Sequence, residues 1–152
     1  MRIEDEIKVM KFRDNWHKCT VNILFTASWL TRNLERRAAK VDITLQQFNA
    51  LRILRGQLPK PTTNNLLGSR LINNTPDIPR LIDRIVSKGL VLRTQNKNDK
   101  RAVDLFITDR GLDLLQEIED EMMLTDLLPG NLSDQEAEML TRLLDKLRGS
   151  SV

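Results

Sequence analysis

Two groups of polar and basic side chains in the middle of the chain have the types and spacing needed to contact a polyanion. The first group is Asn73, Asn74, Thr75, Asp77, Arg80 and Arg84. The second group is Lys97, Asp99, Lys100 and Arg101. Asparagine and arginine match the hydrogen-bonding edges of adenine and guanine, and lysine and arginine also neutralise phosphates. The chemistry available to these residues is therefore binding.

The second group lies in an entirely polar stretch over residues 94–101, which has no apolar side chain to bury. The natural use of such a stretch is contact with phosphates or insertion of an arginine into a minor groove. Asp99 precedes Arg101 by two residues, so its carboxylate can pair with the guanidinium and hold that side chain in place. The alternative is an exposed ion pair of little energetic value.

Charge is unevenly distributed along the chain. Residues 1–42 contain nine basic and six acidic side chains, and residues 43–101 contain eleven basic and three acidic ones. Residues 102–152 reverse this balance, with four basic and twelve acidic side chains. The middle third is thus the candidate surface for a polyanion, whereas the acidic third should face away from it. The alternative is a basic face that only contacts solvent.

Composition excludes several functional classes. With one cysteine and one histidine, the chain cannot form an internal disulfide or a usual zinc site, so we expect no metal and a cytoplasmic location. We find no nucleophile–base pair, phosphate loop or carboxylate dyad, and therefore expect no catalytic residues, no cofactor and no enzyme. The N-terminus lacks the apolar segment of a secretory signal, and no stretch is apolar enough to make a membrane a partner.

The elements that position these residues are mainly helical. Apolar residues at three- and four-residue steps predict one long helix over residues 6–39. Its centre is apolar on nearly all sides, so one of its packing partners is expected to be a second subunit. Thr44 and Gln47 form a capping box that opens a second helix, which ends near Gly56.

Two further helices are predicted before the polar stretch. Thr62 or Thr63 can cap the first of them. Thr75 followed by Pro76 predicts the start of the second, with proline at the first helical position, and Gly89 predicts its end. An apolar stripe would dock this helix on the core and leave its polar groups outside, as in a DNA-recognition helix. A plain amphipathic helix with a solvated charged face is the alternative.

A hairpin and two helices complete the chain. Residues 90–93 and 103–107 predict two strands joined by a long, basic and mobile tip. Thr108 can cap the following helix, which we expect to be broken at Pro129-Gly130, and Ser133 with Glu136 forms a capping box for the last helix. The predicted fold class is mainly α with a small β-hairpin wing, a winged helix-turn-helix.

The predicted recognition helix, the polar stretch and the helix after it follow one another as the motifs of a known family do. Over roughly residues 20–120, the chain resembles the MarR family of bacterial regulators. The recognition-helix motif of the family is matched by Arg80, Leu81, Ile82, Asp83, Arg84, Lys88, Gly89, Leu90 and Val91. Its D-x-R wing is matched by Asp99 and Arg101. Its L-T-x-x-G motif after the wing is matched by Ile107, Thr108 and Gly111.

The resemblance implies a transcriptional regulator, acting as a repressor, that binds double-stranded DNA at a palindromic operator as a homodimer. It also implies a ligand cleft between the dimer part and each DNA-binding lobe, so a small-molecule effector is a candidate partner. Residues 1–152 then form a single domain. Within it, residues 44–110 are the winged helix-turn-helix, and residues 1–43 and 111–152 are the helical dimerisation region.

Two residues depart from the family pattern. Pro79 is placed one turn into the predicted recognition helix, where it removes a backbone donor and a possible DNA contact. Asp77 brings a negative charge close to phosphates, so it should face a base donor or an arginine. Both motivate an alternative function, a MarR-like dimeric interaction module with weakened or lost DNA binding.

The first predicted helix contains a second set of candidates: Trp16, His17, Cys19 and Trp29. The tryptophans can line an effector cleft, or belong to the core or the dimer interface. Cys19 resembles the reactive cysteine of family members that sense peroxide, and His17 and Lys18 lie next to it. Those sensors also use tyrosines, which this chain lacks, so a small packing residue is the alternative. The spacing around His17 gives it no metal role.

Overall fold

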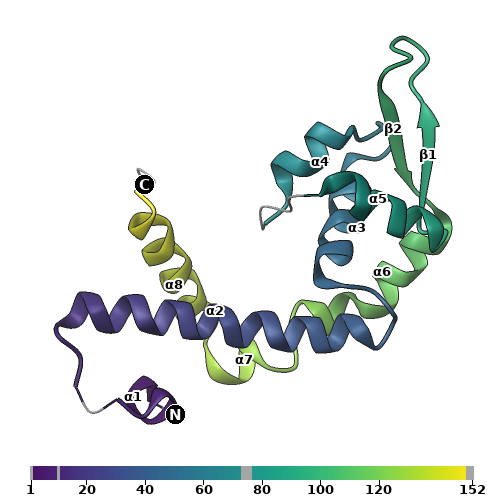
Figure 1. Ribbon diagram of the computed structural model, residues 1–152. Helices are drawn as coiled ribbons and strands as arrows, with labels where there is room; N and C mark the ends of the chain where they lie inside the picture. Colours follow the sequence, from purple (N-terminus) through teal and green to yellow (C-terminus); the bar gives the residue numbers. More distant parts are fainter. Residues whose placement is uncertain (1, 10, 73–76, 150–152) are drawn as a thin grey trace.

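The computed structural model describes residues 2–9, 11–72 and 77–149, which are mainly helical and carry one antiparallel hairpin (Figure 1). The elements are α1 (Ile3–Ile7), α2 (Asn15–Ala39), α3 (Leu45–Gln57), α4 (Asn64–Arg70), α5 (Ile78–Ser87), β1 (Val91–Gln95), β2 (Val103–Ile107), α6 (Asp109–Met122), α7 (Leu128–Asn131) and α8 (Asp134–Leu147). This order confirms the predicted fold class. None of the helices formed by the described residues has the length and apolar character needed to cross a bilayer.

The first prediction that fails is the single helix over residues 6–39. The structure has two helices there, because α1 ends at Ile7, before Lys8 with its left-handed φ of 54°, and α2 begins only after Asp14. The Asp14 carboxylate accepts the backbone N–H of His17 at 2.8 Å and so caps α2. Apolar periodicity continued across this local stop signal, which the sequence prediction overlooked.

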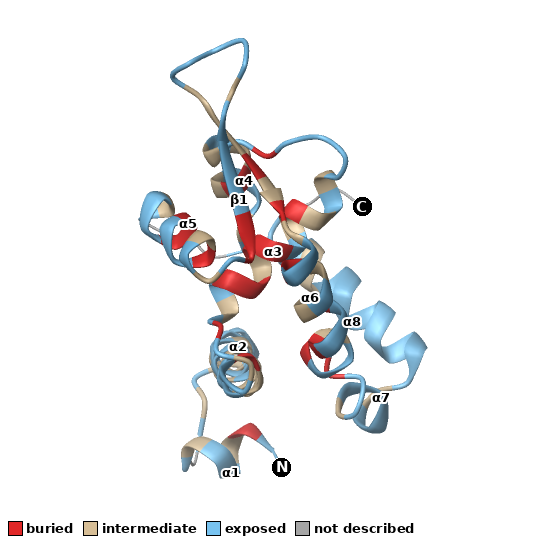
Figure 2. Cartoon of the chain, turned by 90° about the vertical axis from the view of Figure 1, so that its right-hand side faces the viewer, coloured by how far each residue is buried: buried red, intermediate tan, exposed pale blue. Residues whose placement is uncertain are grey.

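The core lies between α3, α4, α5, the hairpin and α6 (Figure 2). Helix caps fix where these helices begin. Its fully buried aliphatic side chains are Leu51, Leu54, Leu67, Ile82, Ile85, Leu90, Leu105 and Leu115. The capping box of Thr44 and Gln47 is confirmed, with both hydrogen bonds present. Of the two threonines proposed to cap α4, Thr63 does so, whereas Thr62 is buried and pairs with Leu105 of β2.

The C-terminal third differs from its prediction at one place. Helix α6 ends at Met122 and the chain turns at Leu124, which is buried with a left-handed φ of 56°. Pro129 and Gly130 therefore do not break α6 but lie inside α7. Proline is tolerated there because the first turn of a helix lacks partners for its N–H groups in any case. The capping box of Ser133 and Glu136 at α8 is confirmed.

Candidate nucleic-acid interface

Helix α5 has two chemically distinct faces. Leu81, Ile82 and Ile85 are buried against the rest of the core, as the predicted docking stripe requires. Arg80 and Arg84 are exposed and lie four residues apart, so their side chains project from the same outward face. The helix thus presents two guanidinium groups to solvent on a rigidly docked scaffold.

The start of α5 differs from the prediction. The predicted cap, Thr75, lies outside the described residues, as do Asn73 and Asn74. The helix begins at Ile78, and the Asp77 carboxylate accepts the backbone N–H of Arg80 at 3.0 Å. Asp77 therefore uses its negative charge to cap the helix N-terminus, where the helix dipole favours it, so no DNA donor is needed to explain it.

The position predicted for Pro79 was also wrong, whereas the loss of a possible DNA contact stays a prediction. Because α5 begins at Ile78, Pro79 is its second residue and lies in the first turn, not one turn further along. The first N–H groups of a helix have no acceptor within it, so a proline there removes no helical hydrogen bond. Both residues thus fit the start of α5, and the alternative of weakened or lost DNA binding stays a prediction.

An ion pair that the sequence prediction missed joins α5 to the wing. Asp83 Oδ1 of α5 lies 2.5 Å from Arg93 Nη1 of β1. Both side chains are substantially exposed, so we expect the pair to contribute little to overall stability. Its significance is geometric, because it links the helix to the strand that leads into the wing tip. The only signal in the sequence was the membership of Asp83 in the resemblance motif.

The wing is a five-residue antiparallel ladder with Val91 opposite Ile107 and Gln95 opposite Val103. It projects beyond α5 and carries the tip away from the core (Figures 1 and 2). Lys97, Lys100 and Arg101 are all exposed on this tip. The structure therefore places the two groups of candidate residues, as far as they are described, on neighbouring elements.

Asn96 organises the wing tip. Its side-chain oxygen accepts the backbone N–H groups of Asn98 at 2.8 Å and Asp99 at 2.9 Å. Its side-chain nitrogen donates to the carboxylate of Asp104 on the opposite strand at 3.0 Å. The backbone of Asn96 also pairs with Ala102 at 3.0 Å. One side chain thus ties the tip to the ladder, a role that sequence reasoning did not assign.

Asp99 holds Arg101 differently from the prediction. Its Oδ1 atom accepts the backbone N–H of Arg101 at 2.9 Å, and the described residues contain no ion pair between the two side chains. This is the common turn in which an aspartate bonds the backbone two residues on. The aspartate therefore shapes the turn and leaves the guanidinium available to solvent.

Replacing Asn96 with alanine is expected to weaken DNA binding about fivefold, because the tip loses the acceptor for two N–H groups and its tie to Asp104. Titration of labelled duplex DNA measures the affinity, and thermal unfolding should show little change because the tip is exposed. The matched control is Asn98→Ala, whose side chain makes no hydrogen bond to the described residues. Equal affinities for the two variants would contradict a role for Asn96.

The structure separates the residues of the second candidate set. Trp16, at the start of α2, is 78% exposed and is no part of this chain's core, and His17 and Cys19 are exposed beside it. The neighbouring Lys18 directs its ammonium group to the Glu4 carboxylate of α1 rather than to the thiol. A thiol-based sensor through Cys19 stays a prediction.

Trp29 lies further along α2 and lines a cavity of about 370 Å³ between α1 and α2. Trp16, His17 and Cys19 do not line it. Its walls are formed by Ile3, Glu6, Asn22, Phe25, Thr26, Trp29 and Arg32. The lining combines aromatic and aliphatic side chains with polar ones, including one acidic and one basic side chain.

Comparison with known proteins identifies relatives of this arrangement. A model described as the MarR family matches residues 43–103, which include α5 and the wing tip. The HTH-type transcriptional regulator MhqR of Bacillus subtilis (strain 168) is 24% identical over 116 residues, or 76% of this chain and 79% of that protein. The match therefore extends beyond the winged helix-turn-helix itself.

Solved structures give a similar result at higher identity. A mutant of MarR from E. coli, complexed with operator DNA, is 31% identical, with a TM-score of 0.71 over 82% of this chain and 89% of that chain. A MarR transcription factor from Planctomyces limnophilus is 30% identical, with a TM-score of 0.68 over 89% of this chain and 98% of that chain. Sequence identity and structural similarity to these two proteins thus both extend over most of this chain.

Proposed function

Because this chain belongs to the MarR family of DNA-binding transcription regulators, we propose that it is a cytoplasmic repressor that binds a palindromic operator as a homodimer. The observation that carries the proposal is the pairing of a docked α5, with Arg80 and Arg84 outside, and a projecting wing with Arg101 at its tip. In this arrangement α5 enters a major groove and the wing reaches the adjacent backbone or minor groove.

Unpartnered apolar surface supports the homodimer. Helix α8 has no buried residue among those described and projects away from the body of the chain (Figure 1). Its large exposed apolar side chains are Met139, Leu140, Leu143 and Leu147. On α2, Trp16 and Leu24 are exposed as well. Residues 1–43 and 111–152 would bury this surface between two copies, leaving residues 44–110 to bind DNA.

Selection of bound duplexes from random DNA tests the proposal. A two-fold symmetric dimer should enrich inverted repeats with half-site centres about ten base pairs, or one helical turn, apart. Sedimentation should give the mass of two chains, and the affinity should fall steeply with salt because lysines and arginines displace counterions. A stable monomer, or a dimer that enriches no sequence, would overturn the proposal.

We further propose that a small organic effector occupies the cavity beside Trp29 and releases the operator. In a Trp16→Phe background the emission of the chain reports on Trp29 alone, since the sequence has two tryptophans. A ligand that changes this emission should weaken operator binding about tenfold, a typical coupling between two sites. Ligands that change the emission but leave operator affinity intact would show that this cavity does not regulate the protein.

A further inference from the structure

The direction of α8 depends on a short connection. Helix α8 contributes no buried residue, so contacts within the chain restrain its orientation only weakly. What precedes it is the turn at Leu124, the short helix α7 and the capped start of α8 at Ser133. The contacts that hold this connection against the rest of the chain therefore determine the direction of α8.

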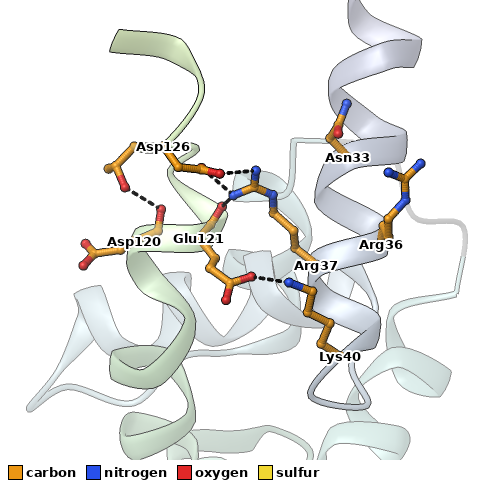
Figure 3. A pocket seen from close by; sticks show the side chains of 8 residues that line it. Asn33, Arg36, Arg37, Lys40, Asp120, Glu121 and Asp126 are labelled. Carbon is orange, nitrogen blue, oxygen red and sulfur yellow. Dashed lines mark hydrogen bonds and ion pairs between the residues drawn. The ribbon is translucent and has the colours of Figure 1, made fainter. Parts of the chain in front are cut away.

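Arg37, near the end of α2, forms hydrogen bonds to both ends of this connection's start, at Glu121 and Asp126 (Figure 3). Its Nη1 atom donates to the backbone carbonyl of Glu121 at 2.7 Å and to Oδ1 of Asp126 at 2.7 Å. Its Nη2 atom donates to Oδ2 of Asp126 at 2.9 Å. One guanidinium thus joins α2 both to the last turn of α6 and to the segment just beyond it.

The geometry of this contact restricts orientation more than a single ion pair would. A two-bond arginine–carboxylate pair fixes the relative plane of both groups. The Arg37 side chain is only 15% exposed, whereas that of Asp126 is 64% exposed. The hydrogen bond from Arg37 lowers the pKa of Asp126 below its usual value.

Buried Met122 and Leu124 also lie at this junction, so apolar packing accompanies the polar contacts. Beside the contact lies an open cavity of about 510 Å³, and every side chain lining it is polar. Lys40 adds a second bridge, with its Nζ atom 2.9 Å from Oε2 of Glu121. Polar contacts from Arg37 and Lys40 therefore add to the apolar packing that joins α2 to the end of α6.

We propose that Arg37 is a positioning residue that sets the direction of α8, and through it the separation of the two α5 helices in the dimer. The inference rests on the proposed function, because it requires that α8 mediates dimerisation. A half-site separation of one helical turn is then determined partly by a contact far from the DNA-binding surface. Loosening the contact should relax the spacing that the dimer accepts.

Distances between paired spin labels test this directly. A label at Ser87→Cys in a Cys19→Ser background places one probe on the exposed end of each α5. We expect the distances between the two labels to be narrowly distributed when Arg37 is present and broadly distributed in Arg37→Ala. The control is Arg36→Ala. The Arg36 side chain lines the same cavity but makes no hydrogen bond or ion pair to the described residues. Asp126→Asn provides a second test, because the Asp126 side chain is 64% exposed and we expect the change to leave the fold intact.

DNA binding gives the second readout. At the selected half-site spacing, Arg37→Ala and Asp126→Asn should bind operator roughly tenfold more weakly than the wild type. When the spacer length is changed, their further loss of affinity should be smaller than that of Arg36→Ala. Unchanged distances and spacer preference in both variants would overturn the inference while leaving the proposed function intact. A wild-type chain without an intersubunit distance signal would instead overturn the proposed function, and this inference with it.

Discussion

Replacing Arg101 with alanine is expected to weaken operator binding by about ten- to a hundredfold at moderate salt. The side chain is exposed at the wing tip, and Asp99 holds its backbone without neutralising its charge. An arginine placed on a phosphate or in a narrow minor groove contributes about 1–3 kcal/mol of binding free energy. Fluorescence anisotropy with labelled operator measures the loss.

The salt dependence of this variant distinguishes two modes of contact. If Arg101 contacts phosphate, binding to all sequences should weaken alike and the salt slope should fall by about one. If it reads a groove, the loss should be larger for the selected operator than for other DNA. The control is Arg2→Ala, which removes the same charge from an exposed pair with Glu4 on α1, away from the wing. Operator affinity equal to that of the control would reject the role of the wing.

Replacing Gly111 with alanine is expected to reduce the free energy of unfolding by about 2–3 kcal/mol. A Cβ atom there would lie 2.5 Å from the backbone oxygen of Leu90 and 2.7 Å from Cγ1 of Ile107. The Leu90 oxygen already accepts the N–H of Thr108 at 3.0 Å, so it cannot move without breaking that bond. Overpacking of this kind costs about 1–3 kcal/mol, and more where backbone must shift.

Urea unfolding at one protein concentration measures this effect, because the stability of a dimer depends on concentration. The matched control is Gly56→Ala in α3, where a Cβ would meet nothing within 4 Å. There the better helix propensity of alanine should raise stability by about 0.5–1 kcal/mol. If both variants were stabilised, the close approach of α6 to Leu90 would not constrain Gly111.

Local signals made much of the fold predictable. The capping boxes at Thr44 and Ser133 and the single cap at Thr108 all occur as predicted, because each bond joins residues only three apart. Both strands were placed to within two residues for the same reason, since alternation and flanking polar stretches mark them. The exposed positions of Arg80, Arg84 and Arg101 followed from the elements that carry them.

Errors occurred where two local signals competed. Before α2, apolar periodicity predicted a continuous helix, whereas the Asp14 cap starts a new one. At α5, Thr75 and Asp77 were both possible caps, and Asp77 caps the helix. The end of α6 was assigned to Pro129 and Gly130, although the chain turns earlier at Leu124, a buried residue with no turn propensity of its own. Which of several possible signals is used depends on what the neighbouring segments bury.

By itself, the sequence determined the helical class, the hairpin wing and the basic residues of the proposed DNA-binding surface, because periodicity, caps and charge act within one element. Only the tertiary structure revealed the contacts between elements: Asp83 with Arg93, Asn96 with Asp104, and Arg37 with Asp126. The last pair is 89 residues apart in the chain. The sequence around a single charged residue does not identify a distant partner, since such a pair depends on the apolar packing that places its two elements side by side.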